Sequence, residues 1–124
     1  MITLGIAVAG GIGAMLRYLI DTVFSAHRPW GIFVINALGS FFLGTLLSFA
    51  LLDNASWIVI LGTGFCGGFT TFSTASMDAV RIYLARPEDS KLQRIFGAAT
   101  YVLSMFMVCV ACAWMGNLVF GFNQ

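Results

Sequence analysis

The sequence predicts an all-α integral membrane protein, with four transmembrane helices in one domain over residues 1–124 and a break within the third helix. Hydrophobic residues make up 60% of the chain and charged residues 9%, and the mean hydropathy is +0.95. A soluble domain is roughly 45–50% apolar and about 25% charged. The charges lie between long uncharged runs, and the third run is rich in glycine and hydroxyl residues. This composition excludes a soluble enzyme and a disordered tail, and the net charge of +1 offers no basic surface for nucleic acid.

The uncharged runs locate the four helices. They cover residues 1–16, 31–52, 57–77 and 95–124. A spanning helix needs about 20 mostly apolar residues, so each run is long enough once its flanking residues are added. The predicted helices cover residues 3–21, 31–52, 57–84 and 93–120. Strands of a membrane β-barrel would alternate between polar and apolar residues, and these continuous runs do not.

The basic residues predict the orientation of the chain. All six lie in or beside the first and third connections: Arg17, Arg28, Arg81, Arg86, Lys91 and Arg94. Cytoplasmic loops carry an excess of Lys and Arg. We therefore expect both of these connections in the cytoplasm of a cell-membrane protein, with both termini outside.

The first two spans carry stripes of small residues at helical spacing. These are Gly5, Ala9 and Gly13 in the first span, and Ser40, Gly44 and Ser48 in the second. Such faces let helix backbones approach closely in lipid. The stripes predict helix packing and assembly but no chemistry.

Two polar side chains in these spans are open to two interpretations each. Arg17 is either a structural residue that reaches the cytoplasmic interface, paired with Asp21 one turn later, or a functional group within the membrane. Asn36 is either one half of an interhelical hydrogen bond or a hydrogen-bond donor to a ligand, because its amide offers two N–H groups and an acceptor.

The third span holds the most unusual segment, residues 62–76. It contains four glycines and six hydroxyl residues. Neighbouring glycines lower helix propensity, and hydroxyls can satisfy freed backbone groups within a membrane. The segment predicts a broken helix near the bilayer midplane, where transporters bind ions through exposed carbonyls, although a simple kink is the alternative. Because no nucleophile–base pair or carboxylate pair lies within a span, we expect no enzyme activity.

Three segments together carry a resemblance to a known family. They are residues 10–18 (GGIGAMLRY), 36–41 (NALGSF) and 64–74 (GFCGGFTTFST). In these motifs and in the order of its four spans, the chain resembles the Fluc (CrcB) fluoride channels. The resemblance implies a passive fluoride-selective channel that exports the anion. It also implies an antiparallel dimer with two pores, each lined by both subunits, and a central structural sodium ion held by backbone carbonyls.

The resemblance assigns roles to individual residues. The sodium-binding carbonyls would be those of Gly67 and Thr70. The residues of the fluoride pathway would be Asn36, Phe72, Ser73, Thr74, Ser76 and Tyr101, with Ser104 near a further polar position. Amide and hydroxyl donors, together with the positive edge of an aromatic ring, can replace the water shell of fluoride.

At three positions the chain departs from the pattern of the family it resembles. Ala75 stands where a second phenylalanine is expected, Met105 stands where a serine is expected, with Ser104 one place away, and Cys109 stands at the next polar site. The resemblance implies that the first phenylalanine of one subunit, Phe72 here, lines a pore together with these three positions of the other subunit. The departures suggest one half of a heterodimer with a single working pore, and a homodimer with two pores is the alternative.

Two other classes of protein fit the length and the four spans. A small multidrug exporter would need a carboxylate within the first span, which offers Asp21 only at its end. A subunit that assembles with a partner but conducts no ion is the second alternative, and the broken third span argues against it.

Overall fold

The computed structural model describes residues 1–24, 30–50 and 56–121, and all the elements in these ranges are helical. The first two helices are α1 (Ile2–Val23) and α2 (Trp30–Ala50), and the last is α6 (Lys91–Gly121). The third span consists of α3 (Ser56–Val59), the π-helical segment η2 (Ile60–Cys66), α4 (Gly67–Phe69) and α5 (Phe72–Leu84).

Four helices, counting the third span as one, are long and apolar enough to cross a membrane within the described part of the chain. Their bounds agree with the predicted spans to within two residues. Residues 51 and 52, at the end of the predicted second span, lie outside the described residues. The four-helix membrane fold is therefore confirmed.

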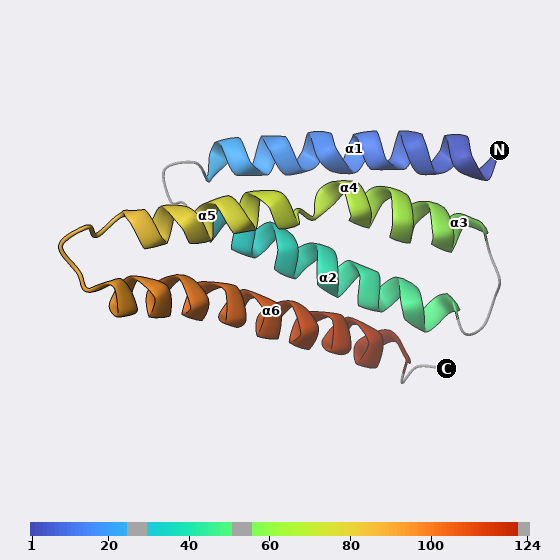
Figure 1. Cartoon of the computed structure of the whole chain (residues 1–124). Coiled ribbons are helices and arrows are strands. Elements are labelled where there is room, and N and C mark those ends of the chain that lie inside the picture. Colours follow the sequence, from blue (N-terminus) through green and yellow to red (C-terminus); the bar gives the residue numbers. More distant parts are fainter. Residues whose placement is uncertain (25–29, 51–55, 122–124) are drawn as a thin grey trace.

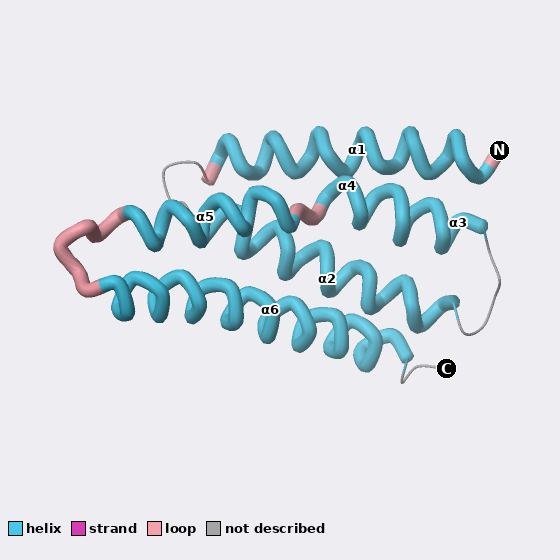
Figure 2. The backbone as a smooth tube through the Cα atoms, viewed as in Figure 1, coloured by secondary structure: helices cyan, strands magenta, loops and turns pink. Residues whose placement is uncertain are grey.

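The helices run side by side along one axis (Figures 1 and 2). The third span packs on α1 through η2 and α4, while α6 packs on α2 and α5. Figure 1 shows α1 and α6 along opposite edges of the bundle. The centre is held by a cluster of buried apolar residues: Ile32, Ile35, Phe69, Ala75 and Met105.

The small residues of α1 pack against the third span. A Cβ atom added at Gly13 would overlap the carbonyl of Phe65 and lie 2.9 Å from Phe69 N. One added at Gly64 would lie 2.7 Å from Ile6 O. The two backbones are therefore in direct contact, and the packing predicted from the α1 stripe is found inside the chain.

The stripe on α2 packs in the same way against α6. A Cβ atom at Gly44 would overlap the backbone of Ala113, and one at Gly116 would lie 3.0 Å from Thr45 N. Ser48 Oγ donates a hydrogen bond of 2.9 Å to the carbonyl of Asn117. Small residues thus join the four spans in two pairs.

The third span breaks at Thr70 and Thr71. Thr70 has φ −82° and ψ 160°, and Thr71 has φ −150° and ψ 126°, so both residues are extended. The hydroxyl of Thr71 accepts a hydrogen bond of 3.3 Å from Thr74 N and caps α5. The predicted break is therefore confirmed, and it lies within the glycine- and hydroxyl-rich segment.

The hairpin between α5 and α6 is held by polar contacts. Ser90 N donates to Gln93 Oε1 at 2.9 Å and Gln93 N donates to Ser90 Oγ at 3.3 Å, which is a capping box at the start of α6. Arg94 Nε donates to Tyr83 O at 2.6 Å, and the guanidinium lies 4.2 Å from the centre of the Tyr83 ring. These contacts fix the antiparallel path of the two helices.

The basic residues that the structure describes lie toward one end of the bundle. α1 and α5 finish there and α6 begins there (Figure 1). Arg17 is half-buried in the last third of α1, and its Nε has no hydrogen-bond partner among the described residues. Arg28 and the acidic residue of the second connection, Asp53, lie outside those residues.

Candidate ion pathway

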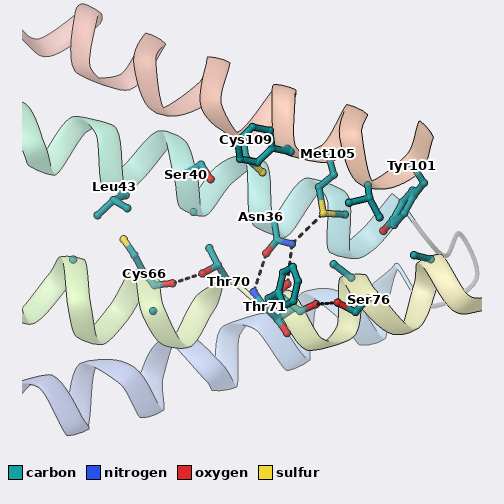
Figure 3. A pocket seen from close by; sticks show the side chains of 18 residues that line it. Asn36, Ser40, Leu43, Cys66, Thr70, Thr71, Ser76, Tyr101, Met105 and Cys109 are labelled. Carbon is teal, nitrogen blue, oxygen red and sulfur yellow. Dashed lines mark hydrogen bonds between the residues drawn. The ribbon is translucent and has the colours of Figure 1, made fainter. Parts of the chain in front are cut away.

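A partly open cavity of about 590 Å³ lies beside the break. Its walls come from α2, the third span and α6 (Figure 3). Polar groups on the wall are those of Asn36, Ser40, Thr70, Thr71, Ser76 and Tyr101. Among the described residues that line the cavity, none carries a full charge.

Asn36 connects α2 to the break. Its side chain is 8% exposed. Asn36 Oδ1 accepts a hydrogen bond of 2.8 Å from Thr71 N, and Asn36 Nδ2 donates one of 3.0 Å to Thr71 O. A side-chain amide has the same donor and acceptor as a peptide group, so Asn36 supplies both partners that the extended backbone of Thr71 needs.

The second N–H of Asn36 points to α6. Asn36 Nδ2 lies 3.4 Å from Met105 Sδ, in hydrogen-bonding geometry. A thioether sulfur is a weak acceptor. The interhelical hydrogen bond, one of the two interpretations of Asn36, is therefore found, since its side chain joins α2 to the third span and to α6.

The break removes the usual donors of two carbonyl groups. In a regular α-helix the N–H of Thr71 would donate to the carbonyl of Gly67, and that of Thr74 to the carbonyl of Thr70. Here Thr71 N donates to Asn36 and Thr74 N donates to the Thr71 hydroxyl. Carbonyls at such unwound helix breaks coordinate sodium in transporters. The carbonyl oxygens of Gly67 and Thr70 therefore fit the predicted sodium site as ligands. The described residues contain no cluster of His, Cys, Asp or Glu that could hold a metal ion.

Phe72 begins α5 and points away from the core of its own chain. The residue is 84% exposed, although it also lines the cavity. Two predicted pathway hydroxyls, those of Ser73 and Thr74, lie 3.3 and 3.2 Å from the Thr71 hydroxyl and do not line the cavity. Ser76 does line it, and its hydroxyl donates to Phe72 O at 2.9 Å.

One face of α6 forms the opposite wall. Tyr101, Met105 and Cys109, which are spaced one turn apart, all contact the cavity. Ser104 lies off this face: it is exposed, and its hydroxyl donates to Tyr101 O at 2.9 Å. Met105, and not Ser104, therefore lines the cavity from α6. Ala75 lines the same cavity from α5.

The sequence pattern does not single out one buried carboxylate, that of Asp78. Asp78 in α5 is 1% exposed, and its Oδ1 accepts a hydrogen bond of 2.8 Å from Arg81 Nη1. Its Oδ2 is buried with no hydrogen-bond partner in the described part of the chain. The signal was an acidic residue inside the predicted third span, and intramembrane carboxylates are functional candidates by default.

Comparisons with known proteins identify the family of the chain. The profile of the family described as "CrcB-like protein, Camphor Resistance (CrcB)" matches residues 4–117. The "Fluoride-specific ion channel FluC 1" of Leifsonia xyli is 40% identical over 127 residues, which cover 95% of this chain and 88% of that protein. The "Fluoride-specific ion channel FluC 2" of Rhodococcus jostii is 35% identical over 118 residues, or 94% and 96% of the two chains. Because the match extends over nearly the whole of each sequence, the chain belongs to the CrcB family.

Proposed function

We propose that the chain is a subunit of a passive fluoride-selective channel that exports fluoride from the cytoplasm. The observation that carries this proposal is an uncharged cavity with polar groups on its wall, at a helix break held by Asn36. Fluoride is strongly hydrated, so a pore must offer donors in place of water. Donors without a fixed full charge let the ion both enter and leave. The names of the relatives support fluoride as the ion.

The proposed channel is an antiparallel dimer in the cell membrane, with the first and third connections in the cytoplasm. Phe72 supports the dimer, because it lines the cavity and yet is 84% exposed in the single chain, so that a second chain packed there would enclose it. Ala75, Met105 and Cys109 lie on the cavity wall, and their side chains carry no hydroxyl group. We therefore favour a heterodimer with one working pore, in which a related subunit supplies the missing groups. The Lys and Arg residues of that subunit would lie in the loops at its other end, so that it inserts in the opposite orientation. A homodimer with two pores is the alternative.

The proposed structural sodium ion lies between the two subunits at the carbonyls of Gly67 and Thr70. Its support is the loss of the helical donors of these two groups. Gly67 is exposed, and an added Cβ atom would meet nothing within 4 Å. The backbone at Gly67 is therefore accessible from outside the chain. When bound, the ion supplies a positive charge that joins the two breaks.

Fluoride efflux from liposomes tests the proposal. The purified chain is reconstituted alone, and efflux is recorded with a fluoride-selective electrode and, as a control, with a chloride electrode. Rapid fluoride efflux without chloride efflux establishes a homodimeric channel and contradicts the heterodimer. If the chain alone gives no efflux, it is co-expressed with a relative whose Lys and Arg residues favour the opposite orientation. Fluoride efflux from that combination establishes the heterodimer. Silence in both experiments identifies a subunit that conducts no ion.

A further inference from the structure

The contact between Met105 and Asn36 has a consequence for any anion that enters the cavity. Asn36 Oδ1 and one Nδ2–H are committed to the backbone of Thr71, at 2.8 and 3.0 Å. The remaining N–H is the donor that the Asn36 amide can offer to an anion. That is the N–H that faces Met105 Sδ at 3.4 Å (Figure 3).

The side chain of Met105 is fixed by packing as well as by this contact. It is 7% exposed and belongs to the central apolar cluster with Ala75. Ala75, on α5, carries only a methyl group, and a long, flexible methionine packs well beside so small a residue. An anion that approaches the remaining N–H of Asn36 would therefore meet the thioether of Met105.

We infer that Met105 blocks anion binding at Asn36 within this chain. The bulk of its side chain covers the only uncommitted donor of the amide, and its sulfur satisfies that donor weakly. Replacement of Met105 by a small residue uncovers the amide. This inference rests on the proposed function for the identity of the anion, fluoride, but the blocked donor is a property of the single chain.

Solution NMR of the chain in detergent micelles tests the inference without requiring transport. The side-chain amides are labelled with ¹⁵N-asparagine, Asn36 is assigned from an Asn36→Asp variant, and sodium fluoride is titrated against sodium chloride. In Met105→Ser, fluoride should shift the Asn36 amide resonances at a concentration at least tenfold lower than in the parent chain. Met105→Leu keeps the bulk, so its amide should respond as weakly as the parent.

The matched control is Met107→Ser, because Met107 lies on the same helix but is 64% exposed. It should leave the fluoride response of Asn36 unchanged. Met105→Cys provides a second small variant if Met105→Ser does not fold, which is judged from its melting temperature. Equal responses in the parent, Met105→Leu and the small variants would overturn the inference, and so would no response in any of them.

Fluoride efflux of the same variants separates this inference from the proposed function. If the parent conducts fluoride but the small variants show no gain in amide response, the channel assignment stands and the blocking role of Met105 fails. If the small variants gain the response but no dimer conducts fluoride, the blocking role stands and the channel assignment fails.

Discussion

At the scale of single residues, the site depends most on Asn36. An unpaired backbone group inside a membrane has no water to bind, so a helix break needs substitutes for both the lost donor and the lost acceptor. Asn36 provides both to Thr71 from a neighbouring helix. The same amide reaches α6 through Met105 Sδ. One side chain thus joins three spans at the cavity.

Replacement of Asn36 by alanine should destabilise the fold. Thr71 N–H would lose its partner in a buried position, where such a loss is worth about 1–3 kcal/mol. We expect a lower melting temperature in detergent, measured by tryptophan fluorescence. Asn117→Ala is the control, because the hydrogen bond that Asn117 accepts from Ser48 uses its backbone carbonyl. If both variants had the same melting temperature as the parent chain, Asn36 would not stabilise the break.

Two glycines of α1 should respond in opposite ways to alanine. A Cβ atom at Gly13 would lie 2.9 Å from Phe69 N and overlap Phe65, whereas one at Gly11 would meet nothing within 4 Å. Overpacking costs about 1–3 kcal/mol, while an open glycine replaced by alanine gains roughly 0.5–1 kcal/mol in a helix. Gly13→Ala should therefore lower the melting temperature and Gly11→Ala should not. Equal effects would mean that α1 does not pack on the third span through this face.

The residues of the site were only partly predictable from the sequence. Asn36 stood out because a primary amide is rare in an apolar span, but its partners lie 35 and 69 residues away. No local pattern encodes such distant contacts. Asp78 was missed because the uncharged run that marks the third span ends at residue 77, directly before it. The α6 wall was predicted at Tyr101, but Ser104 points elsewhere because its neighbour Met105 takes the inward position.

At the scale of elements, the break divides the third span into a part packed on α1 and a part packed on α6. The helix bounds were predictable because the membrane thickness fixes the length of each span. The break was predictable because glycines weaken a helix and hydroxyls can cap the next one. The π-helical geometry of η2 was not predictable from the sequence. In a segment of seven residues, i+4 and i+5 hydrogen bonding cannot be distinguished by the spacing of apolar residues.

The start of α5 should depend on the hydroxyl of Thr71. This hydroxyl accepts the N–H of Thr74 at 3.3 Å. Loss of such a cap costs about 0.5–2 kcal/mol, so Thr71→Ala should lower the melting temperature and Thr71→Ser should restore most of the loss. Thr63→Ala, at an exposed position of η2, is the control. A Thr71→Ala variant as stable as the parent would contradict the capping role.

At the scale of the whole molecule, the proposed sodium site predicts an ion-dependent assembly. Carbonyls of two chains would approach one another at the breaks, and a bound cation would favour the dimer by mass action. Exchange of sodium for N-methylglucamine should shift the purified dimer toward monomer in size-exclusion chromatography. Potassium should substitute poorly if the site selects by size. A dimer population that is the same in all three salts would contradict a structural sodium ion.

Labelling of opposite ends of the bundle tests the orientation. In a chain whose native cysteines are replaced, Thr3→Cys lies at the N-terminal end of α1 and Glu88→Cys lies in the α5–α6 turn, and both positions are exposed. A membrane-impermeant maleimide applied to intact cells should modify Thr3→Cys but not Glu88→Cys, because the basic connections should stay inside. Labelling of half of each variant would indicate insertion both ways, as an antiparallel homodimer requires.

The pairing of α2 with α6 has a consequence for how the protein is made. Asn36 leaves the ribosome 35 residues before Thr71 and 69 residues before Met105. At about 5–20 residues per second, the amide stays in the membrane without its final partners for on the order of seconds. The nascent chain during that interval presents an unpaired polar group to lipid. Translation that stopped before α6 would therefore leave a fragment open to membrane proteases, because the last helix to be synthesised completes the centre of the bundle.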